Sequence, residues 1–249
     1  MDIIAARDLT VGYGRTEVLC RVGFSIPEGR ITAVVGVSGS GKSTLLKTLA
    51  GLLPPIEGGF EFDGRPVDYN SEASLSRLYE KIGVLYQDGA LLNGLTLYEN
   101  VALPVRMQYP QLPEDVVGDM VHAGLAQVEM ADSAAKFPAE LSGGMRKRGA
   151  LARALVLNPD LVFCDEPSSG LDPITSRRLD DLLLELKERN RMTLVVVTHE
   201  LRSIDRVADR VLLLNEGAIR FAGDYADLAG SGDDFVRTFF LRKDHHDDA

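Results

Sequence analysis

The chain has 249 residues, a formal net charge of −10 and a sequence pI near 4.9. Apolar residues make up 45% of it and charged residues 26%, which is typical of a globular protein with enough apolar material for a sizeable core. This balance excludes a disordered chain and a disulfide-dominated mini-protein, and the acidity argues against a nucleic-acid-binding surface. The longest stretch without an acidic or basic residue, Ile31 to Gly41, is too short to span a membrane.

The cysteines and the first residues bear on the compartment. Cys20 and Cys164 lie in apolar contexts without a C-x-x-C pairing, which suits a reducing cytosol better than a disulfide or a metal site. Residues 1–4, Met-Asp-Ile-Ile, carry no basic segment ahead of an apolar one, so we expect no signal peptide. Together with the composition, these features predict a soluble, cytoplasmic protein.

Short β-like runs alternate with turns in the first third of the chain. Strands are predicted over residues 3–13, 18–26, 30–35, 60–62 and 82–86. The leucines of residues 42–53 recur at helical spacing, and this helix would end at Pro54-Pro55. A second helix is predicted over residues 74–81.

The β signal disappears between residues 89 and 154 and then returns. Helices are predicted over residues 96–107, 113–130 and 142–157, with breaks at Pro104, Pro110 and Pro138. Beyond them, strands (161–164, 193–197) alternate with helices (173–188, 201–209), and a hairpin over 211–221 turns at Glu216-Gly217.

Strands separated by helices of this length indicate a mostly parallel sheet covered on both faces. We therefore predict an α/β fold of a single domain over residues 1–249. Residues 1–88 and 156–230 would form the core with an N-terminal antiparallel β portion, residues 89–155 an inserted helical subdomain, and residues 231–249 a C-terminal helix and a polar tail.

A glycine-rich stretch lies between a predicted strand and a predicted helix. It fits the pattern G-x-x-x-x-G-K-[ST], in which backbone N–H groups wrap a phosphate and the helix start adds positive potential. Lys42 would reach the β- and γ-phosphate oxygens, and the Ser43 hydroxyl would bind Mg²⁺. We therefore predict a nucleoside-triphosphate site over Gly36, Val37, Ser38, Gly39, Ser40, Gly41, Lys42 and Ser43.

An apolar strand downstream ends in two carboxylates, Asp165 and Glu166. They would lie at the C-terminal edge of the sheet, where open α/β sheets bind their ligands. Asp165 would hold Mg²⁺ through water, and Glu166 would orient or deprotonate the attacking water. Alone, this pattern also fits a solvated strand end. The glycine-rich loop upstream is what supports its interpretation as part of a nucleotide site.

A second candidate phosphate site opens the basic helix near residue 142. Ser142 is a residue type that caps helices, and Gly143 and Gly144 free the next amides for close approach of an anion. Because the loop upstream already holds one nucleotide, we expect this site to bind the nucleotide of another copy of the chain. The alternative is an ordinary capped helix. Residues 146–148, Arg-Lys-Arg, are expected to form a solvated helix face rather than a lipid-binding patch.

In their order, these motifs resemble those of the ATP-binding-cassette (ABC) ATPases, and the resemblance covers residues 3 to 230. It implies a P-loop ABC ATPase core. Gly36–Thr44 would be the Walker A motif, which adds Thr44 to the site, and Leu161–Glu166 the Walker B motif. Leu141–Met145 would be the signature, and residues 169–172 the D-loop.

Three single residues receive roles from the resemblance alone. Tyr13 would stack on adenine, Gln87 would sense Mg²⁺ and the membrane partner, and His199 would contact the γ-phosphate. Each also has a purely structural alternative. Tyr13 would then be a strand-end aromatic, Gln87 a turn residue and His199 a structural histidine.

A departure from the family pattern narrows the resemblance. Met145 stands where the commonest signature has Gln, but it lies past the phosphate-contacting residues, so ATP contact is expected to survive. Together with residues 86–92, 97–106 and 172–175, this signature resembles the corresponding stretches in the ATPases of the Mla/Mce systems. Those systems move phospholipids or related lipids between bacterial membranes. Residues 137–140, Phe-Pro-Ala-Glu, resemble importers rather than exporters.

The resemblance implies an ATP-hydrolysing subunit that uses ATP and Mg²⁺ to power a membrane transporter. Two copies would pair through their ATP sites and join integral membrane permease subunits on the cytoplasmic face of the inner membrane. A small accessory cytosolic subunit and a lipid-binding Mce-domain subunit are further candidate partners. The alternatives are another importer-like transporter, a soluble ABC ATPase, and a P-loop kinase or GTPase. No nucleic-acid partner is expected.

Residues 88–104 are a candidate docking surface for the membrane partner. They follow Gln87 and carry Leu91, Leu92 and Leu95 around an Asn-Gly turn. If these leucines are exposed, they would form an apolar patch of the kind that binds other proteins. The alternative is that they belong to the core of the helical subdomain.

A short helix is predicted over Asp233–Arg242. Its apolar stripe needs a surface to pack against, either its own domain or another subunit. His245 and His246, in the acidic tail, are expected to face solvent rather than bind a metal. The stripe consists of Phe235, Val236, Phe239 and Phe240.

Overall fold

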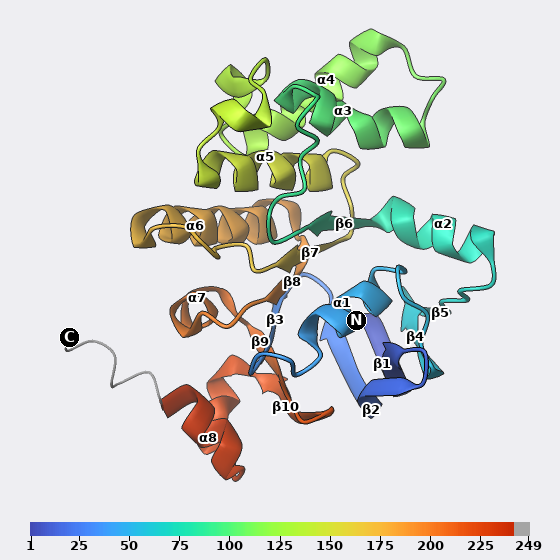
Figure 1. Ribbon diagram of the computed structural model, residues 1–249, viewed down its shortest axis with the longest axis vertical. Helices are drawn as coiled ribbons and strands as arrows, with labels where there is room; N and C mark the ends of the chain where they lie inside the picture. The colour runs from blue at the N-terminus through green and yellow to red at the C-terminus, as the bar shows by residue number, and fades with distance from the viewer. Residues whose placement is uncertain (242–249) are drawn as a thin grey trace.

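The computed structural model describes residues 1–241 and contains two sheets and a block of helices (Figure 1). The larger sheet has six strands in the order β10-β9-β3-β8-β7-β6, and only β10 is antiparallel to its neighbour. The predicted α/β class with a mostly parallel sheet is confirmed. The strands of this sheet are β3 (Ile31–Gly36), β6 (Ile82–Leu85), β7 (Leu161–Asp165), β8 (Thr193–Val197), β9 (Arg210–Asn215) and β10 (Ala218–Asp224).

Helices cover both faces of this sheet, so its central strands are apolar along their whole length. Every residue of β3 and β8 is buried. In β7, Leu161 and Phe163 join the apolar cluster beneath α1, while Val162 and Cys164 join the cluster beneath α5 and α6. The helices that meet this sheet are α1 (Lys42–Leu49), α2 (Glu72–Lys81), α5 (Gly143–Leu155), α6 (Pro173–Asn190) and α7 (Leu201–Val207).

The smaller sheet is antiparallel, with the strand order β2-β1-β4-β5. Its inward side chains, among them Ile4 and Phe60, share one apolar cluster with Leu45 and Leu49 of α1. The helix after the glycine-rich loop is therefore packed between the two sheets, and the predicted antiparallel N-terminal portion is confirmed. The strands are β1 (Asp2–Tyr13), β2 (Thr16–Pro27), β4 (Glu57–Phe62) and β5 (Arg65–Pro66).

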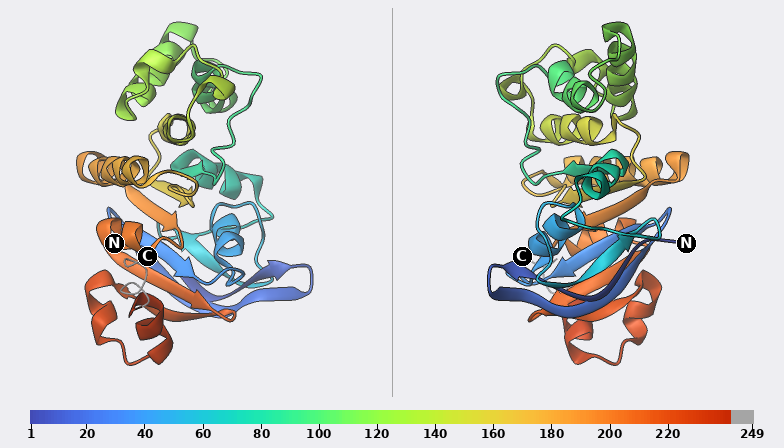
Figure 2. Two further views of the ribbon diagram at one scale, coloured as in Figure 1. Left: turned by 60° about the vertical axis from the view of Figure 1, so that its left-hand side comes forward. Right: turned by 90° about the vertical axis from the view of Figure 1, so that its right-hand side faces the viewer.

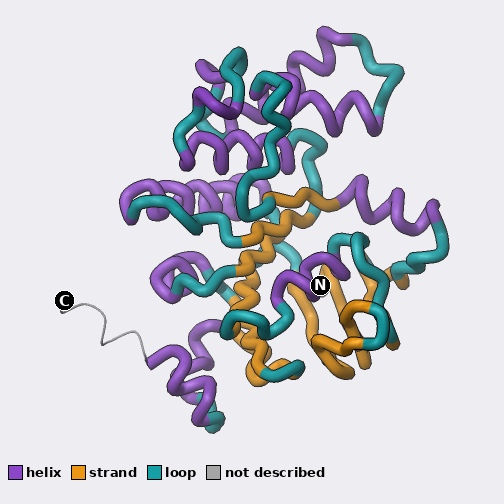
Figure 3. The backbone as a smooth tube through the Cα atoms, viewed as in Figure 1, coloured by secondary structure: helices purple, strands orange, loops and turns teal. Residues whose placement is uncertain are grey.

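A helical block occupies one end of the elongated molecule, at the top of Figures 1 and 2. It consists of α3 (Leu97–Gln108), α4 (Glu114–Gln127) and α5. Figure 3 shows helices and loops at this end, and the strands of the described chain lie below it. Because α5 also contacts β6, it joins the block to the larger sheet.

Two predicted helix boundaries are wrong. The first helix ends at Leu49 rather than Leu53, because Gly51 has a φ of 77° and the amides of Leu52 and Leu53 both bond to the Lys47 carbonyl. Pro104 does not break α3 but lies inside it. A capping box between Thr96 and Glu99, together with the buried face of α3, outweighs the one hydrogen bond that the proline removes.

The C-terminal helix α8 (Asp234–Leu241) packs on its own chain, which is one of the two arrangements considered from the sequence. Val236 is fully buried against residues of β9 and the short helix Tyr225–Gly230. Asp233 holds the start of α8, because it accepts hydrogen bonds from the Phe235 amide at 2.8 Å and from Arg220 Nη2 at 2.7 Å. The predictions for Arg242, His245 and His246 lie outside the described residues.

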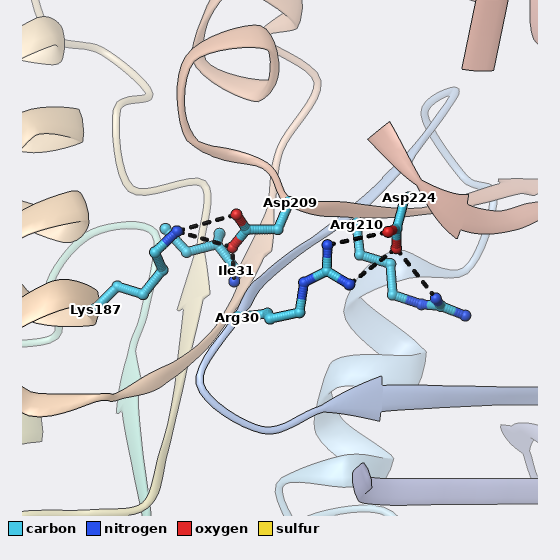
Figure 4. Close-up of polar contacts among 6 residues, drawn as sticks. All are labelled: Arg30, Ile31, Lys187, Asp209, Arg210 and Asp224. Carbon is cyan, nitrogen blue, oxygen red and sulfur yellow. Dashed lines mark hydrogen bonds and ion pairs between the residues drawn. The ribbon is translucent and has the colours of Figure 1, made fainter. Parts of the chain in front are cut away.

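A network of charged side chains ties the end of α6 to the start of β3 (Figure 4). Asp209 Oδ2 accepts a hydrogen bond from the Ile31 amide at 2.8 Å, and Lys187 Nζ donates to Asp209 Oδ1 at 3.0 Å. Beside this network, Arg30 makes a bidentate pair with Asp224 at 3.0 and 3.1 Å. Asp209 and Lys187 are mostly shielded from water, so their pairing is worth more than that of an exposed pair.

Asp209→Ala is expected to lower the free energy of unfolding by about 2 kcal/mol, because it leaves the Lys187 ammonium and the Ile31 amide without their acceptor. Urea denaturation followed by circular dichroism measures this change. Arg189→Ala, which breaks an exposed pair with Glu185, is the control and should change stability by less than ~0.5 kcal/mol. Equal effects of the two substitutions would contradict the role given to Asp209.

Within residues 1–241, every helix is too short or too polar to cross a bilayer.

Candidate functional site

The glycine-rich loop connects the end of β3 to the start of α1. Its backbone takes conformations that other residues rarely adopt, with a φ of 79° at Gly39 and 101° at Gly41. At Gly36, a Cβ atom would lie 2.3 Å from the carbonyl oxygen of Leu214. Only glycine fits these positions, and the loop has the strand–loop–helix setting that a phosphate-binding loop requires.

Lys42, the first residue of α1, folds back over this loop. Its Nζ donates hydrogen bonds to the carbonyl oxygens of Gly36 at 2.9 Å and Val37 at 3.1 Å. Burial lowers the pKa of Lys42, and the nearby carboxylates of Glu166 and Asp165 oppose that shift. The ammonium therefore lies against the loop and within electrostatic range of Asp165, the last residue of β7, and of Glu166, which follows it.

The two carboxylates differ in their surroundings. Burial and the charge of Glu166 raise the pKa of Asp165, while Lys47, Lys147 and Lys42 lower it. The Glu166 side chain is 12% exposed, and its residue has a φ of 47°. Glu166 is thus held in an uncommon backbone conformation next to a partly buried acid.

Glu166 is paired with His199, which follows β8. The His199 Nδ1 and Glu166 Oε1 atoms are 2.7 Å apart, and the histidine side chain is 65% exposed. The other carboxylate oxygen, Oε2, is buried and has no hydrogen-bond partner among residues 1–241. A buried acceptor of this kind suits a water molecule or ligand group that donates a hydrogen bond.

One cavity of about 500 Å³ brings most of these groups together. The sequence predicted seven of its nine lining residues as site residues but missed two apolar ones, Leu201 and Phe239. No local pattern could reveal Phe239, because it comes from α8, far along the chain. The cavity is lined by Gly36, Val37, Ser38, Lys42, Gln87, Glu166, His199, Leu201 and Phe239.

The second predicted phosphate site lies elsewhere in the chain. Ser142 caps α5, and its Oγ accepts a hydrogen bond from the Met145 amide at 3.3 Å. Gly143 lines a separate cavity of about 340 Å³ together with Gln87 and Gly170. Within one chain, therefore, the start of α5 and the glycine-rich loop do not line a common cavity.

The remaining predicted site residues surround the loop without lining its cavity. Tyr13, at the end of β1, is 51% exposed, and its hydroxyl lies 3.5 Å from Lys47 Nζ. Ser43 is exposed in the first turn of α1, whereas Thr44 is buried. Ser40 Oγ is buried and has no hydrogen-bond partner among the described residues.

One further expectation from the sequence is wrong. Lys147 is 6% exposed, so residues 146–148 are not a uniformly solvated face. The leucines of residues 88–104 divide between the two alternatives, because Leu91 packs against the core of the helical block while Leu92 is 47% exposed. Buried Asn100 arranges this loop, because its side chain bonds to the amide and the carbonyl of Leu92 at 2.7 and 3.1 Å.

The residues around the cavity fit a nucleoside triphosphate with a divalent cation. Loop amides, the start of α1 and Lys42 supply positive potential for the phosphates. The hydroxyl of Ser43, the carboxylate of Asp165 and the amide oxygen of Gln87 are hard oxygen donors of the kind that Mg²⁺ takes. The unpartnered Oε2 of Glu166 supplies an acceptor for water beside them.

Comparison with known proteins decides the family. A family model described as ABC transporter matches residues 19–169, more than half of the chain. The chain belongs to the ABC transporter family. This confirms the resemblance drawn from the motifs.

Two curated relatives match almost the whole chain. The probable ribonucleotide transport ATP-binding protein mkl of Mycobacterium tuberculosis H37Rv is 38% identical over 95% of this chain and 66% of its own length. The intermembrane phospholipid transport system ATP-binding protein MlaF of Escherichia coli K12 is 36% identical over 96% of this chain and 88% of its own. The chain thus spans 66% of the mycobacterial relative, just under two thirds.

A solved structure matches the fold as well. It is the dimeric, post-hydrolysis state of the ATP-binding cassette MJ0796 bound to ADP and Pi. The TM-score is 0.79 at 30% identity, and the match covers 89% of this chain and 98% of that one. The predicted fold of an ABC ATPase core is therefore confirmed.

Proposed function

We propose that two copies of this chain hydrolyse ATP to drive a membrane transporter of phospholipids or related lipids. One observation carries the ATPase part of the proposal. Lys42, Gln87, Glu166 and His199 come from separate parts of the chain and line the same cavity as the phosphate-binding loop. This combination supplies phosphate binding, a position for a cation and an acceptor for water in one place.

Each residue of the site has its own role toward the bound nucleotide. The loop amides and Lys42 Nζ bind the β- and γ-phosphate oxygens, and Ser43, Gln87 and Asp165 hold Mg²⁺. The cation, when bound, neutralises charge on the phosphates. Glu166 Oε2 accepts a hydrogen bond from the attacking water and orients it. The Nδ1 atom of His199 is paired with Glu166 Oε1, and the other edge of its ring contacts the γ-phosphate.

The second copy completes the site. Ser142, Gly143 and Gly144 begin α5 but do not line their own chain's nucleotide cavity, so their amides are free for the nucleotide of a partner. The structural relative MJ0796 is described as dimeric and bound to ADP and Pi, which supports the same arrangement here. Tyr13, exposed at the end of β1, would stack on the adenine.

The transport part of the proposal rests on the curated relatives. MlaF is named for intermembrane phospholipid transport, and mkl for ribonucleotide transport. The stretches that resemble the Mla/Mce ATPases favour a lipid rather than a ribonucleotide as the transported molecule. The chain would lie on the cytoplasmic face of the inner membrane beside permease subunits, with a Mce-domain subunit and a small accessory subunit as further partners.

Affinity purification of the tagged chain from solubilised membranes tests this assignment. We expect mass spectrometry to find integral membrane permease subunits and co-purified phospholipid with the wild-type chain. Leu92→Glu places a charge on the exposed part of the 88–104 surface and should abolish recovery of the permease. Val116→Glu, at another exposed apolar residue of the helical block, is the control and should leave recovery intact.

The other outcomes identify the alternatives. Bound ribonucleotide in place of lipid would reassign the cargo to the class named for mkl. Purification without membrane subunits, or with nucleic acid or ribosomes, would favour a soluble ATPase over a transporter subunit. Normal recovery of the permease by folded Leu92→Glu would show that the 88–104 surface does not dock it.

A further inference from the structure

Lys147 of α5 is a buried lysine next to the proposed site. Its neighbours in sequence, Arg146 and Arg148, are exposed or partly exposed, but Lys147 is only 6% exposed. It points from the helical block toward the end of β7, where its Nζ donates a hydrogen bond to the main-chain carbonyl of Glu166 at 2.9 Å. A buried ammonium is costly unless it is bonded and compensated, so this contact requires an explanation.

The main chain of Glu166 is held from several sides. Its amide donates to the carbonyl of Val197 in β8 at 2.8 Å, and its carbonyl also accepts from the Ser169 amide at 3.2 Å. The next residue is Pro167, which has no N–H to anchor the following peptide. With a φ of 47°, Glu166 depends on these contacts to keep its orientation, and Lys147 supplies the one from the helical block.

Nearby carboxylates offset part of the cost of burying the Lys147 ammonium. Burial lowers the pKa of Lys147, and the carboxylates of Asp88, Glu166, Asp165 and Glu200 oppose that shift. These four acids come from three places in the chain that meet around the proposed site. Lys147 also borders the cavity that contains Gly143, where the open space can accommodate a larger side chain.

We propose that Lys147 is a positioning residue that orients Glu166 and thereby couples α5 to the hydrolysis of ATP. The inference rests on the proposed function, in which Glu166 orients the attacking water. Helix α5 would then contact both ATP sites of the dimer. Lys147 positions Glu166 of its own chain, and the N-cap Ser142 would contact the nucleotide of the other copy. Lys147 lies five residues after this N-cap, about 7.5 Å along the helix axis, so docking of that nucleotide bears on Glu166 through Lys147.

Lys147→Met tests the inference, since it keeps the length and apolar stem of the side chain but removes the donor. We expect the kcat for ATP hydrolysis by the purified full chain to fall at least ~10-fold, with the KM for ATP changing less than ~2-fold. Lys147→Arg retains N–H donors and has room in the adjoining cavity, so it should recover most of the lost kcat. Arg148→Met, one residue along α5, removes a charge that pairs with the exposed Glu129 and should leave kcat unchanged.

A double variant separates positioning from a general structural role. If Lys147 acts through Glu166, adding Lys147→Met to Glu166→Gln should lower turnover no further than Glu166→Gln alone. Thermal unfolding checks that the variants are folded, and Lys147→Ala replaces Lys147→Met if the latter is not. Two outcomes would overturn the inference when Glu166→Gln itself is inactive. In the first, folded Lys147→Met has the kcat of the wild type. In the second, Lys147→Met lowers kcat by the same factor in the wild type and in Glu166→Gln. Normal turnover by Glu166→Gln would instead overturn the proposed function, and the inference with it.

Discussion

Glu166→Gln is expected to lower ATP turnover by at least ~10²-fold while ATP binding remains intact. The substitution preserves the shape of the side chain and its contact with His199, 2.7 Å away, but it removes the negative charge. The buried Oε2, which has no partner in the described chain, could then no longer attract and orient the attacking water. Steady-state phosphate release measures turnover, and a fluorescent ATP analogue measures binding.

The same substitution should trap the bound nucleotide, so that a dimer accumulates in size-exclusion chromatography with ATP. Glu200→Gln is a matched control, because Glu200 is a nearby carboxylate that bonds to Ser168 Oγ at 2.9 Å and does not line the nucleotide cavity. We expect its turnover to stay within ~3-fold of wild type. Near-normal turnover by Glu166→Gln would remove Glu166 from its assigned role.

A mixture of two inactive variants should regain activity if each ATP site is built from two copies. Lys42→Met disables the phosphate-binding loop, and Gly143→Asp places a negative charge at the start of α5, where phosphate would bind. Each variant alone should be inactive. In a mixed dimer, the intact loop of one copy faces the intact Ser142-Gly143-Gly144 of the other, so one of the two sites is complete.

An equal mixture with free exchange of subunits should therefore recover up to about a quarter of wild-type turnover. Gly143 is chosen because a Cβ there approaches only Leu171, at 3.4 Å, whereas one at Gly144 would lie 2.5 Å from Thr175 Cγ2 and disturb packing. The ATPase activity of the mixture is measured against each variant alone. A mixture as inactive as its components, although the chains exchange, would contradict a site shared between copies.

The elements that carry the site were largely predictable from the sequence. The glycine-rich loop lies where the pattern places it, between β3 and α1, because that pattern encodes a local backbone course that only glycine allows. The apolar run before Asp165 and Glu166 likewise predicts a buried strand with its carboxylates at the C-terminal edge. Both are short-range patterns, and short-range interactions determine their structure.

Boundaries and loop packing were less predictable. The sequence pattern continues the first helix to Leu53, but the conformation of Gly51 ends it at Leu49. Pro104 would end an isolated helix, yet α3 continues through it because its other face is buried in the helical block. In both cases a tertiary or backbone interaction outweighs a local preference.

By itself, the sequence determined the family, the order of the elements and the side chains proposed to bind phosphate, because each of these is encoded within a few consecutive residues. Only the tertiary structure decided which distant residues meet. It placed Phe239 of α8 in the cavity with the phosphate-binding loop, paired His199 with Glu166 and buried Lys147 against the Glu166 carbonyl. These contacts depend on how helices and strands pack across the sheet, and a charged residue among charged neighbours carries no sign of burial in its local pattern.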